Sequence, residues 1–205
     1  LREARAPVVL GAFDERIAAP ADNFALQAAF MRASGRPYGH VLLERKVGVM
    51  AGANTTVRLV APPLEPGNTR ASQAPPAAFS EMIARAAGVE PRGATRVISW
   101  LRPPSDSEPL FVTLEVPRHA EGSLQPAMQG LLPSRWKEFV KGRIVLVGAS
   151  MIDRDLHATP LTVMESGPTH GVYIQAQALA QILDGNRDIW VWPDWVTFLV
   201  TALIA

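Results

Sequence analysis

The chain has 205 residues, of which 48% are hydrophobic and 19% charged, a composition that excludes a disordered or low-complexity protein. Twenty basic and nineteen acidic residues leave a formal net charge of +1, too balanced for the electrostatic attraction on which nucleic-acid binding depends. The chain has no cysteine, which excludes disulfide scaffolds, thiolate zinc sites and cysteine nucleophiles.

Short apolar or alternating segments, separated by proline-rich joints, predict a series of β-strands. The best of them is the segment 143–147, which is apolar after its first residue and is typical of a central strand covered on both faces. The other predicted strands cover residues 8–10, 40–43, 56–60, 96–100 and 110–116.

Helical periodicity is clearest in residues 77–87, where the apolar side chains share one face and Glu81 and Arg85 form an i,i+4 pair on the other. A second helix, deeply packed because its apolar arc is wide, is predicted for residues 171–184. Its polar side is expected to carry Gln177, Gln181 and Asp184. Weaker helical patterns cover residues 23–33 and 134–140.

The alternation of strands and helices indicates an α/β protein with helices packed on the faces of a mixed sheet. No Gly/Ser linker or long charge run divides the chain, so we expect a single domain over residues 1–190.

Polar residues gather in the loop that follows the segment 143–147. Ligands bind outside the carboxyl ends of the strands in open α/β sheets, and a strand ending here puts the loop at such a position. Glycine allows a close backbone approach, and the polar side chains supply hydrogen-bond donors and acceptors. The predicted ligand-binding residues are Gly148, Ser150, Asp153, Asp155, His157 and Thr159. The alternative is that these residues only tie a long crossover loop to the sheet.

Three sharper chemistries fit this loop less well. The alternation of Asp153, Asp155 and His157 suits a metal-assisted or acid/base hydrolase, but no second ligand pair follows at helical spacing. Ser150 lacks the second glycine of a G-x-S-x-G nucleophile elbow, because Ile152 occupies that place. Neither glycine-rich nucleotide motif occurs. We therefore expect no catalytic residue, metal or cofactor in this chain and keep the hydrolase as the alternative.

The C-terminal residues 195–205 carry no charge. This run is about half of the roughly 20 apolar residues that a membrane-spanning helix needs. Trp190, Trp192 and Trp195 lie at its start, as in an interfacial aromatic belt. The pattern predicts that residues 191–205 begin a transmembrane helix, and the alternative is an ordinary packed C-terminal helix.

Three blocks of sequence carry a more specific signal: residues 141–149 (KGRIVLVGA), 155–161 (DLHATPL) and 171–179 (GVYIQAQAL). Their order and spacing resemble the C-terminal half of the type-2 CHASE domain. The strong part of the resemblance runs from residue 137 to about residue 186. Members of that family are extracytoplasmic sensory modules of bacterial adenylate cyclases, diguanylate cyclases, histidine kinases and serine/threonine kinases, and membrane helices follow them.

The resemblance implies a periplasmic sensor domain that recognises an unidentified small-molecule or environmental signal. It also implies attachment to the cell membrane through the C-terminal helix, a homodimeric state and a cytoplasmic cyclase or kinase that the domain regulates. The family's first strand and helix are not visible before Val8, so we expect that residues 1–190 lack the N-terminal part of the domain.

Overall fold

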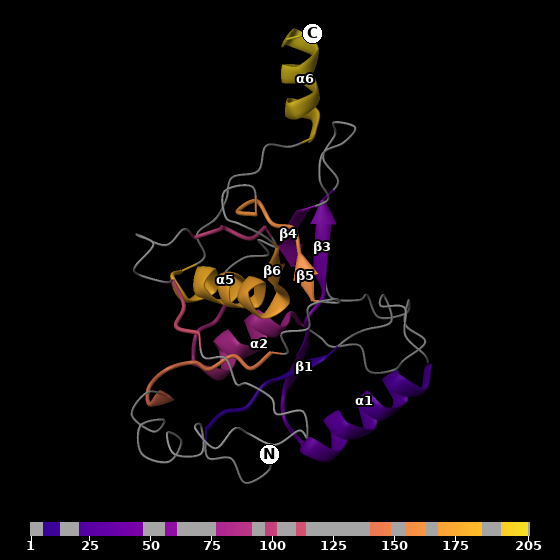
Figure 1. Cartoon of the computed structure of the whole chain (residues 1–205), viewed down its shortest axis with the longest axis vertical. Helices are drawn as coiled ribbons and strands as arrows, with labels where there is room; N and C mark the ends of the chain where they lie inside the picture. The colour runs from indigo at the N-terminus through magenta and orange to yellow at the C-terminus, as the bar shows by residue number, and fades with distance from the viewer. Residues whose placement is uncertain are drawn as a thin grey trace. The chain divides into compact units, whose positions relative to one another are not determined.

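In a computed structural model, the chain divides into two units, one formed by Leu1–Trp100 with Met151–Ala205 and the other by Leu101–Ser150. All the helices and strands named below belong to the first unit (Figure 1). The structure describes residues 6–12, 21–46, 56–60, 77–91, 97–101, 110–113, 140–148, 155–162, 168–185 and 194–204.

The first elements form a β–α–β unit with two parallel strands. Its elements are β1 (Leu10–Ala12), α1 (Ala21–Ser34) and β2 (Tyr38–His40). The helix ends at Gly35, which adopts a φ of +61° that glycine takes without steric cost. The predicted helix 23–33 is confirmed, and the strand predicted at residues 8–10 begins at Leu10.

The other edge of β2 pairs with the segment that leads into α2 (Phe79–Ala86). The His40 amide donates to the Ala77 carbonyl at 3.0 Å, and His40 forms a parallel bridge with Ala78. This close approach requires Gly39, because a Cβ there would lie 2.7 Å from the Phe79 Cα. The helix predicted within residues 77–87 is confirmed.

Two antiparallel pairs and two further helices complete the described elements. Their bounds are β3 (Leu43–Lys46), β4 (Thr56–Val60), β5 (Leu156–His157), β6 (Thr169–His170), α5 (Gly171–Leu183) and α6 (Asp194–Ile204). β3 pairs with β4, and β5 pairs with β6. The strand predicted at residues 56–60 and the helix predicted at 171–184 are confirmed, whereas the predicted strand 40–43 joins the end of β2 to the start of β3.

The mixed α/β class is confirmed, but the strands of the described residues form three two-stranded sheets rather than one mixed sheet. Residues 98–100 are not a strand, although they lie inside the predicted segment 96–100. The Gln181 side chain of the helix 171–183 bonds to the backbone of this segment: its Nε2 donates to the Val97 carbonyl (3.1 Å), and the Ser99 amide donates to its Oε1 (2.8 Å). Residues 110–113 are likewise not a strand, and residues 114–116 lie outside the described part of the chain.

The prediction of a central strand at residues 143–147 was wrong. The described residues 144–148 have no strand structure, and the Ile144, Val145 and Val147 side chains are 42%, 53% and 90% exposed. An apolar run becomes a strand only where a second backbone pairs with it, and that pairing is not encoded in the run itself. Residues 144–148 therefore do not supply the strand end at which the predicted ligand site would lie. The predicted helix 134–140 lies outside the described residues except for Val140.

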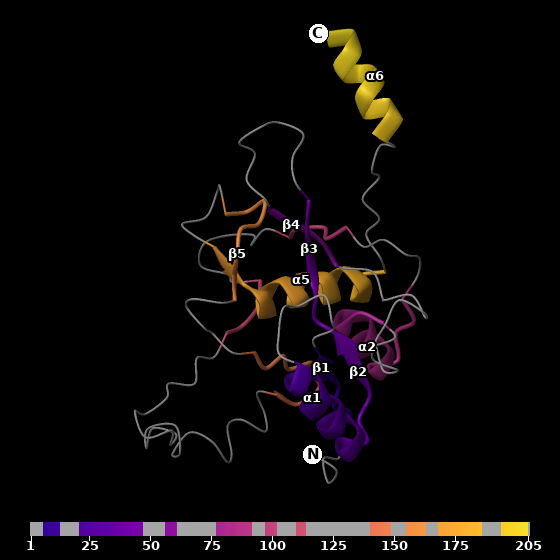
Figure 2. The same ribbon diagram turned by 90° about the vertical axis from the view of Figure 1, so that its right-hand side faces the viewer.

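The core of the first unit surrounds α5, which packs against α2 (Figure 2). Its buried apolar side chains come from β4, the segment before α2, residue 98 and α5. They are Val60, Ala78, Ile98, Ile174 and Ala178, with Leu43 and Trp100 packed against them. Ile174 and Ile98 are almost completely buried, so α5 holds together segments that are far apart in the sequence.

α6 has 11 residues, and three of its exposed side chains, Trp195, Leu199 and Leu203, are large and apolar at i,i+4,i+8 spacing. Within the described ranges, no helix combines the length and the hydropathy needed to cross a membrane.

Candidate functional site

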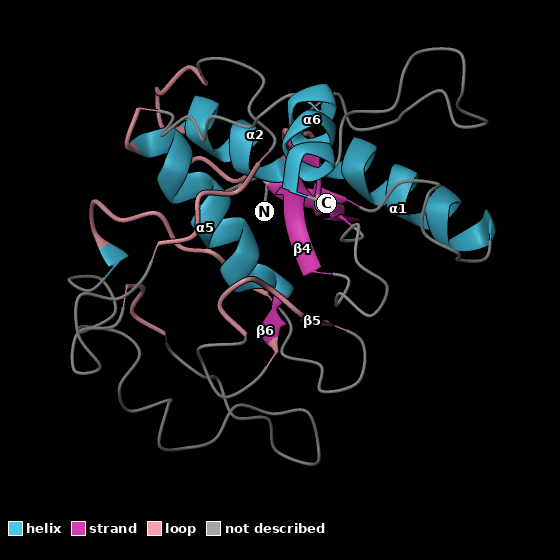
Figure 3. Cartoon of the chain, turned by 90° about the horizontal axis from the view of Figure 1, so that it is seen from above, coloured by secondary structure: helices cyan, strands magenta, loops and turns pink. Residues whose placement is uncertain are grey.

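The strongest polar link between the predicted site and the core joins Asp155 to Gly171, the first residue of α5. The Gly171 amide donates to the Asp155 carboxylate (Oδ2, 3.2 Å) and to the Asp155 carbonyl (3.1 Å). The β5–β6 pair lies at the N-terminal end of α5 and brings these two residues together (Figure 3). A carboxylate at this position offsets the partial positive charge of the helix N-terminus and satisfies one of its unpaired amides.

Gly171 is required for this arrangement. A Cβ on Gly171 would lie 2.5 Å from Asp155 Oδ1, so any side chain would displace the carboxylate. His170, the residue before the helix, makes no side-chain capping bond. The carboxylate of Asp155 therefore does for α5 what a local capping residue does in other helices.

His157 stands next to this carboxylate. Its Nε2 lies 3.5 Å from Asp155 Oδ1, and the His157 and Asp155 side chains are 21% and 36% exposed. Both side chains are thus partly exposed to solvent, although the Asp155 carboxylate also accepts the hydrogen bond from the first amide of α5. The structure brings together these two predicted site residues, which offer an imidazole and a carboxylate to a ligand.

Thr159 is completely buried and bonds within its own loop. Its amide donates to Thr162 Oγ1 at 2.8 Å, the two hydroxyl oxygens are 3.2 Å apart, and the Thr162 amide returns a bond to the Thr159 carbonyl at 3.0 Å. These contacts form a closed turn. For Thr159, the geometry fits the structural alternative, in which local hydrogen bonds shape the loop.

Three predicted site residues are left. Gly148 is exposed and belongs to the unit 101–150. Ser150 and Asp153 lie outside the described residues. Among the residues that the structure describes, no three or more His, Asp or Glu side chains form a group suited to a metal ion.

Sequence reasoning missed the buried glutamines of α5. The prediction grouped Gln177 and Gln181 on a polar side of this helix, but they are only 7% and 5% exposed, and Gln175 is 4% exposed. Gln175 Nε2 donates to the Val41 carbonyl at 3.0 Å, and Gln181 bonds both Val97 and Ser99. A signal was present in the sequence, because α5 contains no charged residue, whereas the outer face of a surface helix normally carries charged residues.

Through these hydrogen bonds, α5 is bonded to three separate backbone segments. Its N-terminus is held by Asp155, its middle binds the chain after β2 through Gln175, and its last turns bind residues 97–99 through Gln181. A change at Asp155 therefore acts on the helix around which the core of the first unit is built.

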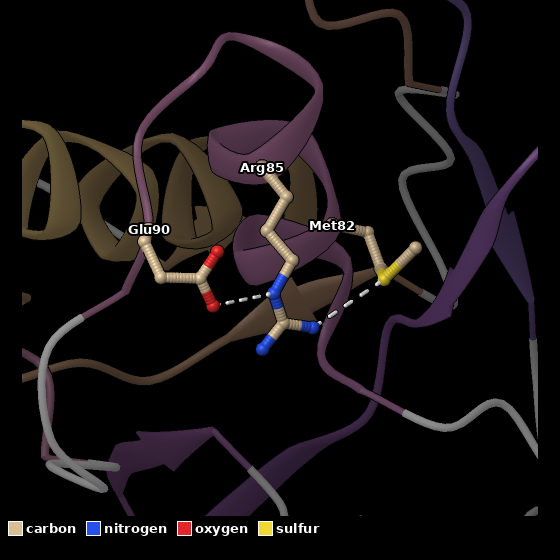
Figure 4. A network of polar contacts seen from close by, with 3 residues as sticks. All are labelled: Met82, Arg85 and Glu90. Carbon is tan, nitrogen blue, oxygen red and sulfur yellow. Dashed lines mark hydrogen bonds and ion pairs between the residues drawn. The ribbon is translucent and has the colours of Figure 1, made fainter.

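A second polar cluster, at the end of α2, is a surface feature (Figure 4). Arg85 Nε lies 3.3 Å from Glu90 Oε1, and another guanidinium nitrogen lies 3.9 Å from the Met82 sulfur. The Arg85 and Glu90 side chains are 42% and 77% exposed, so this ion pair contributes little to stability. Burial raises the pKa of the nearby Glu81 carboxyl; the Arg85 charge opposes this rise, and the Glu90 charge adds to it.

Comparison with known proteins gives one result that covers almost the whole chain. The family model described as the CHASE2 domain matches residues 22–205, a range that includes α1 from its second residue, the Asp155–His157 pair and α5. No curated protein and no solved structure matches the chain. The chain belongs to the CHASE2 domain family and is an extracytoplasmic sensory domain of the kind found in signalling receptors.

Proposed function

We propose that this domain is the periplasmic input module of a bacterial membrane receptor and that it regulates a cytoplasmic cyclase or kinase. The observation that carries the proposal is the family match over residues 22–205, since the family is sensory rather than catalytic. The uncharged run 195–205 and the apolar stripe of α6 support a membrane attachment that begins in α6.

The proposed signal-binding residues are Asp155 and His157, which both belong to the first unit. Support comes from the partial exposure of Asp155 and His157 and from the distance of 3.5 Å between their polar atoms. A small molecule or ion that binds the Asp155 carboxylate competes with the hydrogen bond that the first amide of α5 donates to it. The proposed response is a shift of α5 relative to the segments that Gln175 and Gln181 hold.

Such a response requires that the ligand bind two arrangements of the domain with different affinity. One arrangement has Asp155 bonded to Gly171, and the other has Asp155 engaged by the ligand. Only ten residues separate Leu183, the last residue of α5, from Asp194, where α6 begins. A change in α5 therefore has a short covalent route to the proposed membrane segment.

The hydrolase that uses Asp153, Asp155 and His157 is not proposed. Asp155 is already engaged with the Gly171 amide, which is a structural role, and the family is a sensory one.

The test compares the full receptor with its Asp155→Asn and His157→Gln variants. The matched control is Glu90→Gln, which neutralises an exposed carboxylate at the surface cluster of α2. Output of the cytoplasmic enzyme is measured while external pH, osmolality and divalent-cation concentration are varied one at a time. We expect the wild type and the control to respond to at least one of these changes and the two site variants to respond weakly.

Equal response curves for all four proteins would refute the assignment of the site. An active effector whose output follows none of these external changes in the wild type would count against the sensory role.

A further inference from the structure

Helix α1 carries large apolar side chains on its solvent-facing side. Leu26 is 69% exposed and Phe30 is 53% exposed, whereas Met31, on the opposite side, is 8% exposed. Scattered exposed apolar residues are ordinary in soluble proteins. Here, however, the two are one helical turn apart and lie on the same face, so they form a single apolar surface.

Smaller side chains extend this surface along the whole helix. Residues at spacing i, i+3, i+4, i+7 and i+8 share one face of an α-helix. We call the following set the outer stripe, and all its members are exposed: Ala25, Leu26, Ala29, Phe30 and Ala33. The three alanines allow a second helix to approach closely, at the lower end of the usual range of about 8–10 Å between axes.

Opposite charges lie at the two ends of the same helix. Asp22 is in the first turn and Arg32 in the last, and both are exposed. A second copy of α1 that packs antiparallel places each Asp22 near the Arg32 of the other copy, and the two helix dipoles then also oppose each other favourably. A parallel arrangement places like charges together, which is unfavourable.

The apolar pair Leu26–Phe30 and the charged pair Asp22–Arg32 are centred at nearly the same position along α1. The midpoint between Asp22 and Arg32 falls at position 27, and the midpoint between Leu26 and Phe30 falls at position 28. A two-fold axis near these positions therefore pairs Leu26 with Phe30 of the other copy and aligns the charges in the same step. A self-complementary surface of this kind is what an isologous dimer requires.

We propose that the outer stripe of α1 is the homodimer interface of this domain and that its occupant is the α1 helix of a second copy in antiparallel orientation. The 14 residues of α1 span about 21 Å. One helix pair of that length buries less than the ~1,200 Å² typical of stable complexes, so the contact is weak in solution. Anchoring both copies to one surface raises their effective concentration and populates the dimer. This inference does not depend on the identity of the signal.

Single cysteines test the arrangement directly, because the chain has none of its own. With the axis near positions 27 and 28, the two copies of residue 29 are offset by about 3–6 Å along the helices and those of residue 33 by about 15–18 Å. A disulfide needs Cα atoms within about 7 Å of each other. We expect the Ala29→Cys chain to form disulfide dimers at least about tenfold faster than the matched Ala33→Cys chain.

Disulfide formation is measured on the whole purified chain in two conditions. In one the chain is free in solution, and in the other a C-terminal tag tethers it to neutral phosphatidylcholine vesicles. Adding Leu26→Ser and Phe30→Ser to Ala29→Cys should reduce the disulfide dimer to the Ala33→Cys level. Adding Val112→Ser, which changes a side chain that is 60% exposed in the unit 101–150, should leave it unchanged. Unaltered thermal melting shows that the serine variants remain folded.

Three results would overturn the proposal. They are cross-linking at residue 33 that equals that at residue 29, insensitivity of the cross-link to the two serine substitutions, and absence of cross-linking even on vesicles. Vesicle binding by the untagged chain that disappears in the Leu26→Ser, Phe30→Ser variant, without cross-linking, would assign the stripe to a lipid surface instead.

Discussion

The amide of Gly171 donates two hydrogen bonds to Asp155, one to its carboxylate at 3.2 Å and one to its carbonyl at 3.1 Å. These residues are 16 positions apart in the chain. A helix is usually capped by the residue just before it, but α5 is capped by a residue from the preceding loop. The N-terminus of α5, a helix whose side chains are mostly buried, therefore depends on a partly exposed side chain that a ligand can reach.

Replacing Asp155 by alanine should lower the free energy of unfolding by about 1 kcal/mol, the usual effect of losing a helix cap. Asp155→Asn should cost less, because the amide oxygen still accepts the bond and only the interaction with the helix dipole is lost. Urea unfolding of the chain measures both. Glu90→Ala, which removes an exposed carboxylate, is the control, and a larger loss there would contradict the role given to Asp155.

Gln175 and Gln181 of α5 should differ in their contribution to stability. Gln181→Leu removes two hydrogen bonds, one to the Val97 carbonyl and one from the Ser99 amide, which should cost about 2 kcal/mol or more. Gln175→Leu removes one bond, to the Val41 carbonyl, and should cost about 1 kcal/mol. The difference is expected because Gln175 Oε1 has no hydrogen-bond partner in the part of the chain that the structure describes. The denaturant midpoints of the two variants test this prediction. A lower midpoint for Gln175→Leu than for Gln181→Leu would contradict it.

The helices were predictable because their signals are local. The apolar period of α2 and the uncharged, apolar α5 are readable within one segment, and both helices lie where the periodicity placed them. The strand at residues 143–147 was not predictable in the same way. A strand forms only where a second backbone segment elsewhere in the chain pairs with it. The segment 143–147 has a strong β-strand composition, yet its Val147 side chain is 90% exposed.

The candidate site was predictable only as a set of residue types. Asp155 and His157 stood out as polar residues in one loop, and the structure places them 3.5 Å apart. Their relation to Gly171 was not visible, because a contact between residues 155 and 171 is created by the β5–β6 pair. The buried amide of Gln181 was missed for the same reason, since its partners at residues 97 and 99 are more than 80 positions away.

Two glycines that pair across β1 and β2 should respond differently to the same substitution. A Cβ on Gly39 would lie 2.7 Å from the Phe79 Cα, whereas a Cβ on Gly11 would lie 2.7 Å from Val41 Cγ1. A side chain can rotate away, but backbone that is held in a bridge can move only by breaking it. Gly39→Ala should therefore destabilise the chain by about 1–3 kcal/mol and Gly11→Ala by clearly less. Thermal unfolding of the two variants tests this, and equal losses would show that the β2 edge is not tightly packed.

Glu81 should make stability depend on pH in a direction set by its burial. Because burial raises its pKa in the folded chain, the folded state binds the proton more tightly than the unfolded state. The resulting stabilisation is complete below the unfolded pKa of about 4.3 and is lost as pH rises through the folded-state pKa. Glu81→Gln is neutral at every pH, so it should be more stable than the wild type near pH 7 and lose this advantage near pH 4. Urea unfolding at the two pH values measures the change. A Glu81→Gln chain that is less stable than the wild type near pH 7 would show that the attraction of Arg85 outweighs the cost of burying the charge.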